Sequence, residues 1–152
     1  MFTNSLSEIL ERDLRKLIAE LHGYQEEKNI WVIKPGISNS AGNLSLHLVG
    51  NLNHFIGATL DYTGYVRNRE AEFALKNISR ATMVKSLEDT IVVVKSAIEK
   101  LSDTDLEKEY PLEPFGKKIT TGFMLLHLAT HLTYHLGQVN YHRRFIENDT
   151  ER

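Results

Sequence analysis

Residues 122–144 read GFMLLHLATHLTYHLGQVNYHRR, and this stretch decides the fold that we expect. Four of the chain's seven histidines fall here, spaced by four, four and seven residues: His127, His131, His135 and His142. Neighbours at i and i+4 on an α-helix lie on one face, about 6 Å apart, which is close enough to share a metal ion. The stretch therefore predicts a long helix over residues 121–148 that carries a candidate metal site.

A helix turns by about 100° per residue, which places Gln138 and the four histidines within a stripe about 80° wide. Leucines and Val139 flank this stripe on one side, and aromatic residues flank it on the other: Phe123, Tyr134, Tyr141 and Phe145. The opposite face is mostly polar and is expected to contact solvent: Ala129, Thr133, Asn140, Arg144 and Glu147. We therefore expect the histidines to face inward. Buried imidazoles need partners, so a bound metal, water in a cleft or hydrogen bonds from another helix must satisfy them.

Three further segments repeat apolar residues with the period of a helix. They are residues 5–27, with Ser5 or Ser7 as the expected N-cap, residues 40–60, and a segment that begins after Thr82 and ends near residue 101. The connections show no sustained strand pattern, and only residues 118–120 are expected to pair briefly with residues 109 and 110. Four helices of this length predict an all-α fold, a four-helix bundle with a long crossover loop between helices two and three, in one domain over residues 1–152.

The second predicted helix carries a polar stripe that matches the histidines of the last helix. Asn43, His47, Asn51 and His54 lie within about 80° of one another. This stripe is opposite the centre of the apolar arc, so it is expected either to face water or to be buried on a second side of the helix. Two glycines beside it, Gly50 and Gly57, would admit a close neighbour. From helical geometry alone, His47 remains an open candidate for a metal ligand.

Composition narrows the classes of function. The formal net charge is -2 and the basic residues are scattered, so we expect no nucleic-acid partner. The first residues lack the pattern of a signal peptide and no apolar run is long enough to span a bilayer, so we expect a cytoplasmic protein without a membrane partner. The chain has no cysteine, so any metal must be bound by histidine, carboxylate or water.

Two motifs resemble the DinB/YfiT-like superfamily of four-helix-bundle metalloproteins. The first is NLSLHLVGNL at residues 43–52, and the second is HLTYHLGQ at residues 131–138. The segment RNREAEF at residues 67–73 also resembles a loop of one branch of that superfamily. The order and lengths of the predicted helices agree with it as well, so the resemblance covers essentially the whole chain.

The resemblance implies a divalent metal bound by one histidine of helix two and an H-x3-H pair of helix four. These positions are His47, His131 and His135 in this chain. Leu136 stands where the family motif commonly has an arginine, which leaves the ligands intact but removes a group that would hold an anionic substrate. Four further residues are candidates to support the ligands or to line a pocket: Asn51, His54, His127 and Gln138.

Three neutral imidazoles leave coordination positions open, which is typical of catalytic rather than structural zinc sites. Zinc, nickel and iron(II) all suit such ligands. The resemblance implies a metal-dependent enzyme of the thiol transferase, isomerase or hydrolase type, with a small-molecule substrate such as a low-molecular-weight thiol, and a homodimer. The wide apolar arc of helix two also favours a dimer. Two alternatives remain, namely a non-catalytic protein that a metal stabilises, and a purely structural bundle whose histidines bond to one another and to water.

Overall fold

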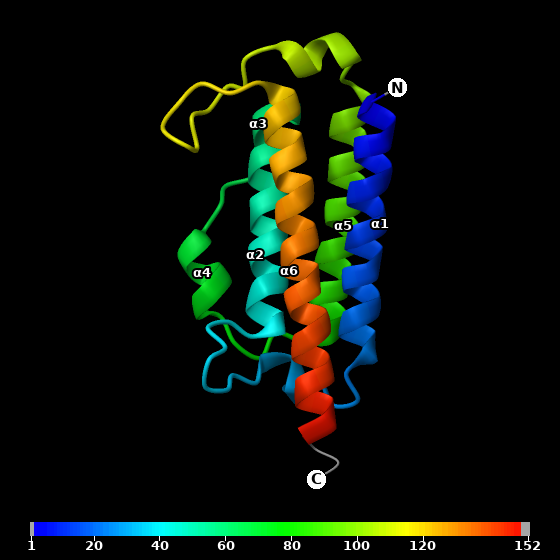
Figure 1. Cartoon of the computed structure of the whole chain (residues 1–152), viewed down its shortest axis with the longest axis vertical. Coiled ribbons are helices and arrows are strands. Elements are labelled where there is room, and N and C mark those ends of the chain that lie inside the picture. Colours follow the sequence, from blue (N-terminus) through cyan, green and yellow to red (C-terminus); the bar gives the residue numbers. More distant parts are fainter. Residues whose placement is uncertain (1, 150–152) are drawn as a thin grey trace.

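The computed structural model describes residues 2–149, which form helices joined by irregular connections (Figure 1). In chain order the elements are α1 (Phe2–Gly23), η1 (Glu27–Trp31), α2 (Ala41–Leu52), η2 (Asn53–Ala58), α3 (Thr59–Asp61), α4 (Arg69–Ala74), α5 (Arg80–Glu99), η3 (Asp103–Glu107) and α6 (Thr121–Asp149). Extended pairing within these residues is limited to an isolated antiparallel bridge between Glu109 and Thr120. The predictions of an all-helical chain and of a brief pairing before the last helix are confirmed.

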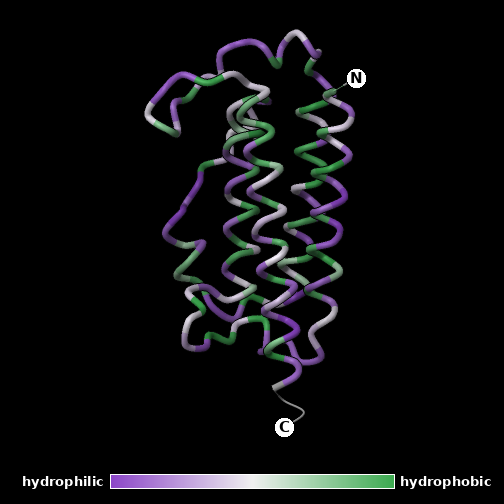
Figure 2. The backbone as a smooth tube through the Cα atoms, in the orientation of Figure 1, coloured by the Kyte–Doolittle hydropathy of each residue, from purple (hydrophilic) through white to green (hydrophobic). Residues whose placement is uncertain are grey.

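The long helices α1, α2, α5 and α6 lie side by side and enclose the core (Figure 1). Helix α1 packs against α5 and α6, and α2 packs against α5, α6 and the short helix α4. Each long helix contributes fully buried aliphatic side chains, for example Leu10, Leu48, Val94 and Leu128. Figure 2 shows hydrophobic positions recurring along the long helices, whereas the connection between α3 and α4 is hydrophilic.

Helix α1 begins earlier than the sequence predicts. It starts at Phe2 and ends at Gly23, so Ser5 and Ser7 lie inside the helix and their expected role as N-caps is wrong. The carboxylate of Asp103 accepts hydrogen bonds from the backbone N–H groups of Phe2, at 3.2 Å, and Thr3, at 3.1 Å. The first N–H groups of a helix have no hydrogen-bond partner within the helix. Asp103, about 100 positions away in the sequence, therefore caps α1 in place of a neighbouring residue.

The second predicted helix corresponds to α2, η2 and α3, which follow one another without a break over residues 41–61. Ser40 caps it by accepting a hydrogen bond from the N–H of Asn43 at 3.1 Å. The middle segment η2 is a π-helix, a form that is frequently found near functional sites.

The crossover loop contains a short helix, α4, that the sequence pattern did not predict. Its six residues are too few for a helical period to be recognised, and Glu72 is its buried residue. The side chain of Asn68 caps it by accepting a hydrogen bond from the N–H of Ala71 at 3.1 Å. Helix α5 then begins at Arg80, slightly before the predicted start after residue 82.

Helix α6 packs on α1 through part of the face that we expected to contact solvent, so the prediction is wrong for Ala129 and Asn140, whereas Thr133 and Arg144 are exposed as expected. Ala129 is buried, Thr133 Oγ1 donates to Asp13 Oδ2 at 2.6 Å, and Asn140 Nδ2 donates to Glu20 Oε1 at 2.6 Å. The face is polar because α1 offers carboxylates to it. The aromatic flank is exposed instead: Phe123, Tyr134, Tyr141 and Phe145. The histidine stripe therefore lies at the edge of the core.

No helix within residues 2–149 combines the length and the apolar character needed to cross a membrane.

Candidate metal centre

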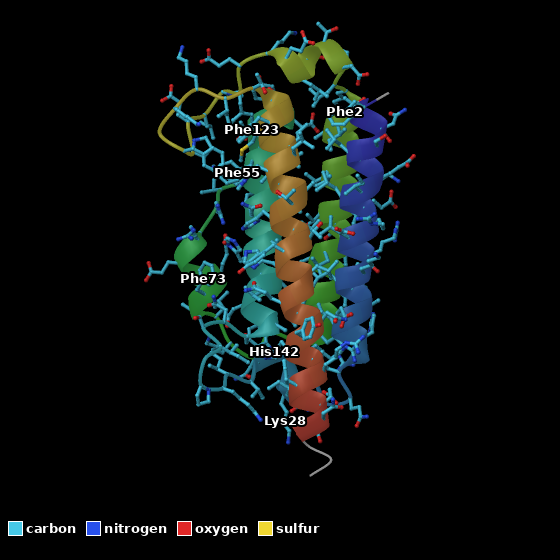
Figure 3. All side chains as sticks on the ribbon, in the orientation of Figure 1. Phe2, Lys28, Phe55, Phe73, Phe123 and His142 are labelled. Carbon is cyan, nitrogen blue, oxygen red and sulfur yellow. The ribbon has the colours of Figure 1, made fainter. Side chains whose placement is uncertain are left out.

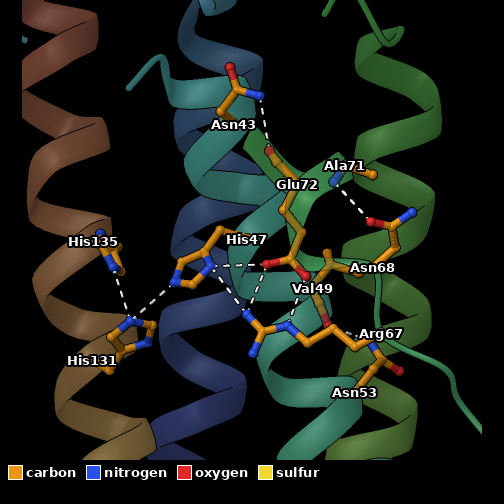
Figure 4. Close-up of polar contacts among 10 residues, drawn as sticks. All are labelled: Asn43, His47, Val49, Asn53, Arg67, Asn68, Ala71, Glu72, His131 and His135. Atoms are coloured by element: carbon orange, nitrogen blue, oxygen red, sulfur yellow. Dashed lines mark hydrogen bonds and ion pairs between the residues drawn. The ribbon is translucent and has the colours of Figure 1, made fainter. Parts of the chain in front are cut away.

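Helices α2 and α6 bring three histidines together, and Figure 4 shows His131 and His135 facing His47. Nε2 of His131 lies 3.2 Å from Nε2 of His47 and 3.1 Å from Nε2 of His135. Among the described residues these three form the group whose ligand atoms all lie within 4.8 Å of one another. The sequence prediction that these three residues share one site agrees with this geometry.

Two of the three rings are held in a defined tautomer by a partner on the other nitrogen. Nδ1 of His47 lies 3.0 Å from Oε1 of Glu72, and Nδ1 of His135 lies 2.6 Å from Oε1 of Gln138. Both oxygens are acceptors, which favours a proton on each Nδ1, although Nη2 of Arg67 also lies 3.3 Å from Nδ1 of His47. The Nε2 atoms of His47 and His135 therefore present lone pairs toward His131.

The spacing of the Nε2 atoms suits a tetrahedral metal ion. A Zn–N bond is about 2.0–2.1 Å long, so two nitrogens of one tetrahedron lie about 3.3–3.4 Å apart. His131 can donate one proton to one of its two neighbours, whereas a divalent cation accepts a lone pair from all three nitrogens. The donor set present here therefore fits a metal ion better than it fits a network of hydrogen bonds.

The protonation state of the His131 and His47 rings also favours a metal site. Burial, together with the neighbouring His135 and His47, lowers the pKa of His131 to about 4. Burial also lowers the pKa of His47, although Glu72 opposes this effect. Neutral imidazole is the form that binds metals, so both rings are ready to act as ligands at neutral pH.

The carboxylate that holds His47 belongs to a buried ion pair. Arg67 binds both oxygens of Glu72, with Nε to Oε2 and Nη2 to Oε1 each at 2.8 Å (Figure 4). Their side chains are 12% and 6% exposed, so the arginine compensates a charge that would otherwise be costly to bury. Neither Arg67 nor Glu72 was among the site residues that we predicted from the sequence.

Helices α2 and α4 are shaped to fit each other at this pair. A Cβ atom on Gly50 would overlap the carboxylate of Glu72, so the glycine makes the close approach possible, as the sequence suggested for a close neighbour. Nδ2 of Asn43 donates to the backbone carbonyls of Glu72, at 2.9 Å, and Leu75, at 2.8 Å. Asn43, on the predicted polar stripe of α2, therefore fixes α4 in place.

Other rings contact each of the three histidines. One of them belongs to Phe73, which Figure 3 labels on α4. The ring of Phe73 on α4 lies 5.0 Å from that of His47, and the ring of His127 stacks on that of His131 with 5.9 Å between centroids. Nδ1 of His131 has no hydrogen-bond partner within residues 2–149, so packing between rings orients this side chain.

Of the four residues that we expected to support the ligands or to line a pocket, three lie at the three-histidine group and one does not. Gln138 contacts a ligand directly, and Asn51 and His127 line a cavity of about 240 Å³ beside His47 and His131. His54 lies in η2 with its ring against Phe55, and is not part of this group.

His142 has a structural environment. Its Nε2 donates to the carbonyl of Val32 at 2.8 Å, and its Nδ1 accepts from the hydroxyl of Tyr24 at 2.6 Å. Both ring nitrogens are thus satisfied by protein groups, which ties α6 to α1 and to the segment after η1.

Residues 3–151 match the family described as "Protein of unknown function (DUF1572)". Because the match spans nearly the whole sequence, this chain belongs to that family. A comparison with curated proteins found no match.

We predict that Glu72→Gln weakens zinc binding about ten- to a hundredfold, because it replaces the charged acceptor that fixes the tautomer of His47. It also leaves Arg67 buried without its counter-charge, which lowers the free energy of unfolding. Isothermal titration with zinc and urea denaturation measure the two effects separately.

The matched control is Glu70→Gln, which removes an exposed carboxylate from the same turn of α4. Adding Arg67→Met to Glu72→Gln removes the uncompensated charge and should recover stability without recovering zinc affinity. Wild-type zinc affinity in Glu72→Gln would show that the carboxylate does not support the site.

Proposed function

We propose that this chain is a DinB-like four-helix-bundle metalloprotein, with a single domain over residues 1–152, that binds one divalent metal ion and acts as a metal-dependent enzyme. The ligands are His47, His131 and His135. The observation that carries the proposal is the convergence of three Nε2 atoms, of which two have their lone pairs directed to the centre by acceptors on Nδ1. The resemblance of residues 43–52 and 131–138 to that superfamily supports the same ligand set.

The ligand set is compatible with zinc, nickel and iron(II), with zinc or nickel preferred, since imidazole suits all three and cysteine is absent from the chain. Three neutral imidazoles leave the double positive charge of the ion uncompensated by its ligands. Glu72 supplies a nearby negative charge, but Arg67 neutralises most of it. A net positive centre of this kind attracts an anionic nucleophile or substrate group.

Enzymatic activity is supported by access to the centre. His131 and His135 are only half-buried, and a cavity of about 240 Å³ reaches His47 and His131. When bound, the metal would act as a Lewis acid, which lowers the pKa of a bound water or of a substrate thiol. Because the chain has no cysteine, the reacting thiol or water comes from outside the protein. This chemistry agrees with a thiol transferase, an isomerase or a hydrolase that acts on a small molecule such as a low-molecular-weight thiol.

A non-catalytic, metal-stabilised protein is the second candidate, and one observation favours it. The ligands belong to α2 and α6, and Glu72 on α4 holds one of them, so a bound ion would cross-link three helices that are distant in sequence. A ligand at a concentration 100 times its Kd stabilises the folded state by about 2.7 kcal/mol. Turnover of a thiol or ester substrate distinguishes an enzyme from this alternative.

We also propose a cytoplasmic homodimer without a nucleic-acid or membrane partner. One flank of α6 exposes four aromatic side chains, each 51–65% exposed: Phe123, Tyr134, Tyr141 and Phe145. Clustered exposed aromatic residues are typical of interaction surfaces, and a two-fold dimer is the commonest assembly. Sedimentation velocity at micromolar concentration should give the mass of two chains, and a monomer at all concentrations would overturn the proposal.

Elemental analysis of protein purified without a histidine tag tests the metal site. We expect close to one zinc or nickel per chain after loading, and a chelator should lower the melting temperature of the loaded protein. His131→Ala and His135→Ala should each reduce zinc affinity by more than about 100-fold, since removing a ligand costs more than removing its support.

His22→Ala is the matched control, because this exposed histidine near the end of α1 lies outside the three-histidine group. It should leave zinc affinity and melting temperature unchanged. Less than about 0.2 metal per chain after loading, together with stability that a chelator does not alter, would rule out both the enzyme and the metal-stabilised protein.

A further inference from the structure

The cavity beside His47 and His131 is lined by charged, polar and apolar residues, most of which are not needed to bind a metal. Its volume is about 240 Å³. Four elements (α2, η2, α4 and α6) and the connections before α4 and α6 contribute to it. The lining residues are His47, Asn51, Phe55, Arg67, Arg69, Pro114, Phe115, Met124, His127 and His131.

The wall contains two arginines and no acidic residue. Arg67 is already paired with Glu72, so its charge is compensated. Arg69 is exposed, has no ion-pair partner among residues 2–149, and lies over the ring of Phe73, with its Cζ 5.4 Å from the ring centroid. The guanidinium of Arg69 therefore keeps hydrogen-bond donors for an incoming anion, and the aromatic ring helps to hold it in position.

The apolar part of the wall comes from the loop before α6 and from the helices beneath it. Phe115 is 43% exposed, and its ring lies 4.8 Å from that of His127 at an interplanar angle of 80°. Phe55, Pro114 and Met124 complete this part of the lining. An aromatic or aliphatic group of a ligand would bury apolar surface here, on the same side of the cavity as the imidazole of His127.

Asn51 contributes a buried polar atom without a partner. The residue is 6% exposed, and its Oδ1 has no hydrogen-bond donor within residues 2–149. Buried polar atoms are nearly always hydrogen-bonded, so this acceptor is available to a donor group that enters the cavity. A hydroxyl or an N–H of a bound molecule would satisfy it.

We propose that this cavity binds a small organic carboxylate with an apolar or aromatic part, the carboxylate on Arg69 and the apolar part against Phe115. The volume admits about ten non-hydrogen atoms, which is smaller than a typical drug-sized ligand. This names the substrate class of the proposed enzyme, and in that sense it rests on the proposed function. The bound molecule would place its remaining polar group near Asn51 and next to the ligands His47 and His131.

Binding of three probes to the metal-free protein tests the proposal without involving the metal. Benzoate carries both features, benzamide has the same shape without the charge, and acetate has the charge without the ring. We expect benzoate to bind at least about tenfold more tightly than either of the others, since a hydrogen bond to a charged group contributes about 1.5–3 kcal/mol. Chemical-shift titration of the methyl group of Met124 follows binding inside the cavity.

Variants assign the two contacts. Arg69→Gln should remove the preference for benzoate over benzamide, and Phe115→Ala should lower benzoate affinity toward that of acetate. Arg144→Gln is the matched control, because this exposed arginine lies outside the cavity, and it should bind benzoate as the wild type does. Equal affinity for benzoate and benzamide in the wild type, or unchanged benzoate affinity in Arg69→Gln, would overturn the proposal.

Zinc titration of the same proteins separates this proposal from the proposed function. Arg69→Gln should bind zinc with wild-type affinity, since Arg69 does not contact the three histidines. If the wild type binds benzoate through Arg69 but does not bind zinc, the proposed function fails while the cavity proposal stands. If zinc binds and benzoate shows no dependence on Arg69, the cavity proposal fails alone.

Discussion

The hydrogen bond between His47 and Glu72 connects the fold of this protein to its chemistry. It joins α2 to the short helix α4, and it places the proton of His47 on Nδ1 so that the lone pair of Nε2 faces α6. The carboxylate is buried, so it depends on Arg67 for its counter-charge and on Gly50 for space. Breaking a buried pair of this kind by removing one partner typically costs about 3–5 kcal/mol. The crossover segment is therefore part of the site.

The same arrangement decides the electrostatics of the cavity. Arg67 and Glu72 compensate each other, and burial lowers the pKa values of His47 and His131, so the unpaired charge on the cavity wall comes from Arg69. A divalent ion at the histidines would add further positive charge. The charge of Arg69 and the charge of such an ion would both favour an anion. The apolar loop before α6 would favour a molecule that also has an apolar part. The proposed metal centre and the charge of the cavity wall would thus favour the same class of small molecule.

The sequence predicted the helices and the grouping of His47, His131 and His135, but it did not predict the contacts that support these histidines. The i, i+4 spacing places His131 and His135 on one face without any knowledge of the fold. The role of His47 depends on how α2 and α6 align, which helical geometry left open and the resemblance supplied. Glu72 could not be found because α4 is too short to show a period and its contact depends on how that helix docks. The polar residues Thr133 and Asn140 were assigned to solvent because the carboxylates that receive their hydrogen bonds belong to α1.

X-ray absorption at the zinc edge, on protein loaded with one equivalent of zinc, tests the central claim most directly. Three imidazole ligands predict nitrogen scatterers at about 2.0–2.1 Å, together with the outer-shell scattering of the rings. His131→Ala should lose one imidazole from this shell, whereas His22→Ala should give the wild-type spectrum. A shell of oxygen ligands without ring scattering, or a spectrum that His131→Ala does not alter, would contradict a metal centre built from His47, His131 and His135.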